Sequence, residues 1–156
     1  MLFTVNGKDL KTELDNLNRI VEKKTTIPIL STILIDADNG SVNLTGTDLD
    51  LFLISPLRHD AQEYFVPGAV CVDAHELTKM TAGLTGNVTF ETDGEKLKIT
   101  SGKVKVSLTT YEKIQFPEIP KVKGKPQIAL TGDLIRSMVK NTVFAVTKEE
   151  SRFTLA

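Results

Sequence analysis

Three runs of alternating apolar and polar residues, separated by tight turns, occupy the stretch from 25 to 57. The first run leads into an Asn-Gly turn, the second leaves it, and the third follows a Gly-Thr-Asp corner. Alternation with a period of two is typical of strands with one buried face, and Asn-Gly is a strong hairpin signal. The stretch predicts a three-stranded antiparallel meander, with Leu49, Leu51 and Leu53 alternating in the third strand.

A strand and a helix are expected before this meander. Residues 1–5 indicate a short strand, and Asn6 can begin a helix because its side chain can accept a hydrogen bond from a free amide of the first turn. The predicted helix ends near Lys23 and Lys24, whose positive charges suit the C-terminal end of the helix dipole. Its apolar face is formed by Leu10, Leu14, Leu17 and Val21.

The same order of elements then occurs a second time. Residues 69–72 indicate a strand, Asp73 and Glu76 form a capping box for a short helix, and three alternating runs follow up to residue 110. The second copy lies about 65 residues after the first, which indicates an internal duplication. We expect an α+β domain over residues 1–120, with repeats at about 1–57 and 68–110, antiparallel sheets, and the helices on one face.

A third copy begins after a segment rich in Pro and charge. Residues 111–126 are predicted to be a linker. Ile128–Leu130 is expected to be a strand, Thr131 to cap a helix, and Arg152–Leu155 to begin another strand. Because a strand without its meander cannot bury its apolar face, residues 127–156 are interpreted as the truncated start of a second domain.

Composition excludes several classes of protein. The 156 residues have a formal net charge of -1, so any contact with nucleic acid must come from local clusters of charge. The single cysteine, Cys71, excludes an internal disulfide and favours a reducing compartment. No apolar segment approaches the roughly 20 residues that cross a bilayer, so the sequence predicts a soluble intracellular protein without a membrane partner.

The sequence gives little support for an enzyme. Asp48 and Asp50 fall on one face of a predicted strand and could bind a metal ion, but strand-end aspartates usually cap turns. No serine or cysteine nucleophile motif lies near His59 or His75 in the sequence. Cys71, between two valines, is better explained as a buried thiol that packs in the core. We predict no catalytic residues, no metal and no cofactor.

Four motifs resemble one known family. They are T-x-P-I-L at 26–30, LTGTDLDL at 44–51, SGKVKVSLTT at 101–110 and the Phe-Pro pair at 116–117. In these motifs, and along residues 1–156, the chain is similar to the N-terminal portion of the bacterial sliding clamp, the beta subunit of DNA polymerase III.

The resemblance implies a function without chemistry. Family members have three domains per chain, and two chains close head to tail into a ring around duplex DNA that tethers the replicative polymerase. The implied partners are DNA, a second copy, and polymerase and clamp-loader subunits that bind through short peptide motifs. The implied location is the bacterial cytoplasm, at the nucleoid. The alternative is a stand-alone clamp-like module that binds DNA or protein without forming a ring.

Helices of successive repeats on one side of a sheet would present their polar faces to DNA phosphates. With the resemblance, the expected DNA-binding residues are Lys11, Arg19, Lys23, Lys24, His75, Lys79, Arg136, Lys140, Lys148, Arg152 and Phe153. The family's dimer edge corresponds to Lys96, Lys103, Lys105, Val106 and Leu108, although some relatives have an aromatic residue at 106. Arg152 and Leu155 correspond to part of the pocket for partner peptides.

Overall fold

A computed structural model describes residues 1–22, 25–59, 64–120 and 128–146. By its internal contacts the chain divides into two units, Met1–Ile119 and Pro120–Ala156.

The first unit contains two successive sets of elements in the same order. The first set is β1 (Leu2–Asn6), α1 (Gly7–Leu17), the 3-10 turn η1 (Pro28–Ser31), β2 (Thr32–Asp38), β3 (Ser41–Thr47) and β4 (Phe52–Leu57). The second set is β5 (Gly68–Asp73), α2 (Ala74–Thr81), β6 (Asn87–Asp93), β7 (Lys96–Ser101), β8 (Val104–Glu112) and the 3-10 turn η2 (Lys113–Gln115). The prediction of a duplicated strand, helix and three-strand meander in an α+β fold is confirmed.

The two repeats exchange their first strands. The sheet order is β1-β6-β7-β8-β5-β2-β3-β4, and the paired strands are antiparallel. β1 therefore pairs with the meander of the second repeat, with Thr4 opposite Thr89, and β5 pairs with the meander of the first, with Ile35 opposite Val70. Because each meander needs a strand from the other repeat, neither repeat completes its sheet alone.

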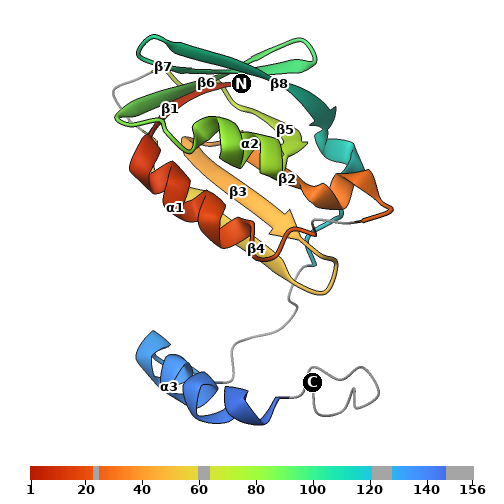
Figure 1. Ribbon diagram of the computed structural model, residues 1–156, viewed down its shortest axis with the longest axis vertical. Coiled ribbons are helices and arrows are strands. Elements are labelled where there is room, and N and C mark those ends of the chain that lie inside the picture. The colour runs from red at the N-terminus through yellow and green to blue at the C-terminus, as the bar shows by residue number, and fades with distance from the viewer. Residues whose placement is uncertain (23–24, 60–63, 121–127, 147–156) are drawn as a thin grey trace. The chain divides into compact units, whose positions relative to one another are not determined.

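Both helices cover the same face of this sheet (Figure 1). α1 contacts α2 and strands β1, β3 and β4, while α2 contacts β5 and β8. The core between helices and strands is built from apolar residues on alternating strand positions and on one helical face, and Phe3 stacks on Phe90 with ring centroids 5.0 Å apart. The fully buried helical residues include Leu10, Leu14, Leu17 and Leu77.

The predicted end of the first helix is wrong. α1 ends at Leu17, earlier than predicted, because Asn18 caps it and the following turn bonds back, with the amides of Ile20 and Val21 donating to the Leu17 carbonyl. Val21 is still buried, but from a turn.

The third strand of the first meander also begins later than predicted. Thr47 and Asp48 build a corner with their side chains, and Leu49 in that corner has a φ of 80°. Leu49 and Leu51 are exposed, and β4 begins only at Phe52. Leu49 and Leu51 therefore belong to a turn, although they continue the alternation of the strand that follows.

The predicted linker over 111–126 begins too early. Tyr111 belongs to β8, and Phe116 is buried against Leu34 and Cys71 in a second, smaller cluster. Leu34 and Cys71 alternate with core residues in their strands, so this cluster lies on the sheet face opposite the helices. The 3-10 turn before Phe116 folds the chain back onto that face.

The second unit contains α3 (Gly132–Thr142) and the 3-10 turn η3 (Val143–Ala145). The predicted cap is present, since the Thr131 hydroxyl accepts from the Leu134 amide. Ile128–Leu130 is not a strand, and the apolar side chains of α3 are exposed, because among the described residues no sheet covers them. The strand predicted at Arg152–Leu155 lies outside the described residues. No described helix is long and apolar enough to cross a membrane.

Candidate nucleic-acid interface

The outer faces of α1 and α2 form the candidate interface. Asn6 begins α1 by accepting a hydrogen bond from the Lys8 amide at 2.9 Å, and Asp73 begins α2 by accepting from the Glu76 amide at 2.8 Å. Each cap fixes where its helix starts and therefore which residues face solvent. The exposed basic residues of α1, the turn after it and α2 are Lys8, Lys11, Arg19, His75 and Lys79.

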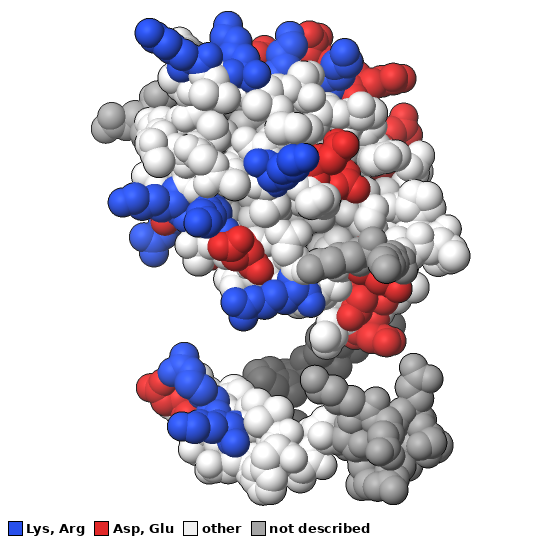
Figure 2. Space-filling model, viewed as in Figure 1, with Lys and Arg blue, Asp and Glu red and all other residues white. Residues whose placement is uncertain are grey.

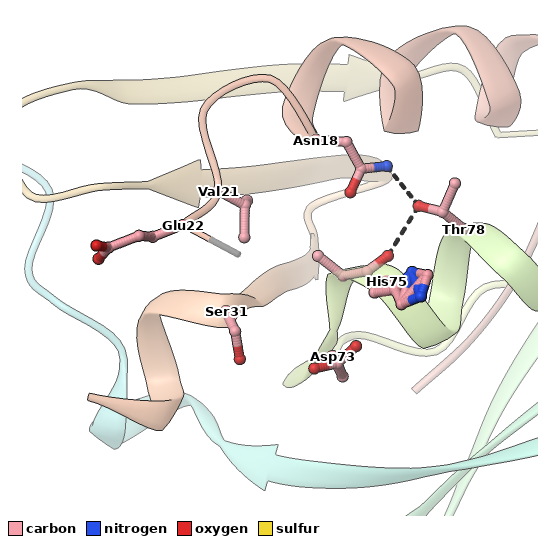
Figure 3. A pocket seen from close by; sticks show the side chains of 8 residues that line it. Asn18, Val21, Glu22, Ser31, Asp73, His75 and Thr78 are labelled. Atoms are coloured by element: carbon pink, nitrogen blue, oxygen red, sulfur yellow. Dashed lines mark hydrogen bonds between the residues drawn. The ribbon is translucent and has the colours of Figure 1, made fainter. Parts of the chain in front are cut away.

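Two hydrogen bonds in series join the two helices at this surface (Figure 3). The Asn18 amide nitrogen donates to the Thr78 hydroxyl at 2.6 Å, and that hydroxyl donates to the Ala74 carbonyl at 2.8 Å. Asn18 is the C-cap of α1, and Thr78 is in the middle of α2. The link thus holds the end of one helix against the side of the other.

A cavity of about 500 Å³ opens beside this link (Figure 3). Its walls come from the turn after α1, from η1, and from the first turns of α2, and they are formed by Asn18, Val21, Glu22, Ser31, Asp73, Ala74, His75 and Thr78. Sequence reasoning missed this cavity, because it depends on α1 ending before Val21, and no sequence signal marked that ending.

The charge of the interface is mixed. Exposed carboxylates lie among these cations, at Asp9 and Asp15 of α1, at Glu22 after α1, and at Glu76 of α2. In Figure 2, which has the same view as Figure 1, blue and red side chains lie close together over this face. The described part of the surface is therefore not the strongly basic face that the sequence led us to expect.

The described cations of α1 and α2 nevertheless remain available to a ligand. The ion pairs among the described residues are Lys98–Asp93, Lys113–Asp36 and Arg136–Asp133. None of them uses Lys11 of α1, Arg19 of the turn that follows it, or Lys79 of α2. Lys11, Arg19 and Lys79 can thus meet phosphates without first breaking an ion pair with a described residue.

Other predicted DNA-binding residues are placed only in part. Arg136 and Lys140 are exposed on α3, where the Arg136 guanidinium donates to Asp133 at 2.9 Å. The remaining predictions lie outside the described residues, namely Lys23, Lys24, Lys148, Arg152 and Phe153, as does Leu155 of the predicted peptide pocket.

The predicted dimer edge is largely exposed. The outer edge of residues 104–109 in β8 has no strand partner among the described residues, since β5 pairs only with the last three residues of β8. Lys96, Lys103 and Lys105 are exposed and Val106 is half-buried. Leu108 is 5% exposed and belongs to the core, because it alternates onto the helix-covered face. Its contact with another chain stays a prediction.

Two residues of the enzyme hypothesis, Asp48 and Cys71, have structural roles. One oxygen of Asp48 accepts from the amides of Asp50 and Leu51 at 3.1 and 2.7 Å, which makes it a corner residue. Burial raises the pKa of the Cys71 thiol to about 11, so it is a poor nucleophile at neutral pH. Within the described residues, no group of three or more His, Cys, Asp or Glu side chains is placed to hold a metal ion.

The chain has a duplicated antiparallel sheet with two helices on one face, which is the fold of sliding-clamp domains. Solved sliding clamps match the chain with TM-scores of 0.85 and 0.91. A family model described as the N-terminal domain of the DNA polymerase III beta subunit matches residues 1–120. The chain belongs to this DNA polymerase III beta subunit family.

Individual relatives cover the whole of this chain but are longer. The beta sliding clamp of Chlamydia pneumoniae is 29% identical over 157 residues, which cover 99% of this chain and 42% of that protein. A sliding clamp structure from Bartonella birtlesii is 32% identical with a TM-score of 0.85, and covers 97% of this chain and 41% of that one. One from Pseudomonas aeruginosa is 25% identical with a TM-score of 0.91, and covers 99% of this chain and 42% of that one. Both structures hold griselimycin. The chain therefore spans about two fifths of the length of the relatives it matches.

Proposed function

We propose that these residues are the first part of a DNA sliding clamp, a processivity factor without catalytic activity. In this proposal the longer protein encircles duplex DNA and tethers a replicative polymerase by topology. The observation that carries the proposal is the match of the family model to residues 1–120, which coincides with a unit that has both helices on one face of a duplicated sheet. A ring that slides needs phosphate contacts that do not read bases, and exposed helical cations supply these.

The proposed DNA-facing residues of the described chain are Lys11, Arg19, His75 and Lys79, together with Arg136 and Lys140 of the second unit. We extend the proposal to Lys23, Lys24, Lys148, Arg152 and Phe153 on the family resemblance alone. Because carboxylates balance the described helical cations, we expect the affinity of this part of the protein for DNA to be low. Low affinity suits a clamp, since the topological link provides retention and tight contacts would slow sliding.

The proposed partners follow the family. The free edge of β8, with Lys105, Val106 and Leu108, would meet a second copy of the full-length protein, together with Lys96 at the start of β7 and Lys103 in the turn before β8. Polymerase and clamp-loader subunits would bind by short peptides at a pocket that includes Arg152 and Leu155, and the protein would act in the cytoplasm at the nucleoid. These partners require residues beyond Ala156. A reading frame that continues for two further domains would support the ring, and a stop codon directly after Ala156 would favour the stand-alone module.

A charge-matched comparison tests the DNA-facing surface. We expect the triple variant Lys11→Gln, Arg19→Gln, Lys79→Gln of this chain to lose affinity for a short duplex at low salt. Its slope of log affinity against log salt should fall in magnitude by about 0.9 per phosphate contact removed.

The control is the triple variant Lys98→Gln, Lys103→Gln, Lys105→Gln. It removes the same number of positive charges from β7, from the turn after it and from β8. We expect it to keep the wild-type salt slope. An equal loss in both variants would show that binding follows net charge, and would reject the helical face as the DNA-binding surface. A strong preference among duplex sequences would also contradict the proposal.

A further inference from the structure

The segment that leaves the first unit is attached to the sheet before it becomes a connector. After β8 the chain forms η2, and Phe116 then packs against Leu34 and Cys71 with only 7% of its surface exposed. Ile29 of η1 and Ala69 of β5 border the same cluster. This cluster lies on the sheet face opposite α1 and α2, so it contributes nothing to the packing of those helices.

An ion pair holds the start of the same segment. The Lys113 ammonium donates to the Asp36 carboxylate of β2 at 2.6 Å, and both side chains are partly exposed. The amide of Phe116 donates to the Lys113 carbonyl at 3.0 Å, which closes the turn between the two attachment points. Ile114, between them, is 86% exposed and takes no part in the attachment.

The attachment is small compared with the main core. One apolar side chain and one partly exposed ion pair hold the segment, whereas twenty buried residues form the main cluster. Elements with few buried contacts open locally at a lower free energy than the rest of a domain. Residues 113–116 can therefore detach while the sheet and both helices remain folded.

We propose that Lys113–Phe116 is a releasable strap whose docking on the outer face of the sheet determines where the connector to the second unit begins. When the strap is closed, Phe116 is the last buried residue before the connector. When it opens, four more residues join the connector and lengthen its reach by up to about 14 Å. The strap thus sets two lengths for the tether between the first unit and whatever follows it.

The only cysteine of the chain reports on the strap directly. Cys71 is fully buried beneath Phe116, and burial raises its pKa to about 11. A thiol reagent reacts with the thiolate, so a closed strap suppresses labelling both by blocking access and by keeping the thiol protonated. No engineered probe is needed, and the full chain can be used as it is.

The first measurement is the rate at which Cys71 reacts with a small aromatic disulfide at pH 8, over a series of urea concentrations below the unfolding transition. Opening of the strap exposes little surface, so the logarithm of the labelling rate should rise with urea far less steeply than global unfolding followed by circular dichroism. Equal slopes would mean that Cys71 reacts only on global unfolding, and would overturn the proposal. This test uses the wild-type chain and does not depend on any variant folding.

The second measurement compares two variants of the strap. We expect Phe116→Ala to label about 10- to 100-fold faster than wild type, the factor that corresponds to the loss of one buried aromatic side chain. Phe116→Leu should restore most of the protection, and Ile114→Ala should label within about twofold of wild type because its side chain is already in solvent. Equal rates for Phe116→Ala and Ile114→Ala would overturn the proposal.

Limited proteolysis provides an independent reading of the same opening. Trypsin cuts after lysine in extended, accessible chain, and Lys113 is held by its pair with Asp36 and by the turn. In Phe116→Ala, mass spectrometry should detect early cleavage after Lys113. The same cut should stay slow in Ile114→Ala. Slow cleavage after Lys113 in both variants would show that the segment stays docked without Phe116, and would contradict the strap.

Discussion

Gly7 begins α1 at a point where the chain has no room for a side chain. An added Cβ would lie 2.7 Å from the Leu84 carbonyl oxygen, and the Gly7 amide donates to the Gly86 carbonyl at 2.8 Å. A close approach of two backbones cannot relax as a flexible side chain does. The glycine is therefore required by the packing of α1 against the loop that follows α2.

We predict that Gly7→Ala lowers the free energy of unfolding by about 1–3 kcal/mol, although alanine favours helices. Urea denaturation followed by circular dichroism measures the change. The control is Gly83→Ala, because an added Cβ at Gly83 meets no atom within 4 Å. A loss no larger in Gly7→Ala than in Gly83→Ala would contradict the close approach.

The buried thiol of Cys71 makes stability depend on pH in the alkaline range. Its pKa is about 11 in the folded protein, above the ordinary thiol value, because burial disfavours the thiolate. Below the ordinary value the thiol is neutral in both states, and its contribution to stability is complete. Between the two pKa values only the unfolded chain ionises, so stability falls as the pH rises toward 11.

We therefore expect the free energy of unfolding to fall by about 1–3 kcal/mol more in wild type than in Cys71→Ala between pH 8.5 and 10.5. Denaturation at several pH values in both proteins measures this difference. All other ionisable groups are the same in both proteins, so their contributions cancel in the comparison. Parallel pH profiles would show that Cys71 is not shielded in the folded state.

At the scale of elements, the contact between α1 and α2 depends on a short polar chain. Thr78 both accepts from Asn18 and donates within its own helix. We expect Thr78→Val to lower the free energy of unfolding by about 1 kcal/mol, since valine has the same shape but cannot accept the hydrogen bond. A double-mutant cycle with Asn18→Ala should give a coupling energy of about 0.5–1.5 kcal/mol.

The matched control for this link is Thr12→Val. Thr12 donates to the Lys8 carbonyl within α1 in the same way, at 3.0 Å, but it is exposed and no side-chain bond joins it to another helix among the described residues. Its replacement should change stability by less than half a kilocalorie per mole, roughly, as for other surface positions. Equal effects of the two substitutions would mean that the link between the helices contributes nothing.

Most elements of the first unit could be predicted from sequence because their signals are local. Period-two alternation, Asn-Gly and Asp-Gly turns, and the caps at Asn6 and Asp73 each depend on neighbouring residues. The exchange of β1 and β5 between repeats could not be predicted, because either meander offers an edge of the same kind. The predicted start of β4 was wrong, because the side chains of Thr47 and Asp48 form a turn within a stretch where the alternation of apolar residues continues.

The candidate site was predictable to a lesser degree. Helical spacing placed Lys11 and Lys79 on exposed helical faces, as the structure has them, whereas Arg19 is exposed from the turn after α1. The same spacing placed Asp15 and Glu22 among these cations, so the mixed charge was readable from the sequence. Spacing did not reveal that Leu108 faces the core. That depends on how β8 is oriented toward the helices, which alternation in a single strand leaves open.

At the scale of the whole molecule, the central claim is that the longer protein holds DNA by encircling it. The first unit is complete as a duplicated domain, and the exposed apolar face of α3 belongs to a unit whose covering is absent from the described residues. The relatives that the chain matches are more than twice its length. A balanced helical surface is compatible with retention by topology and is poorly suited to retention by affinity.

The most direct measurement is the retention of the full-length protein on circular DNA after loading, in salt high enough to abolish contacts with phosphate. The protein should remain on the closed circle and should dissociate as soon as a single restriction cut makes the DNA linear. Equal retention on the circle and on the cut DNA, or equal loss from both, would contradict topological binding by a ring.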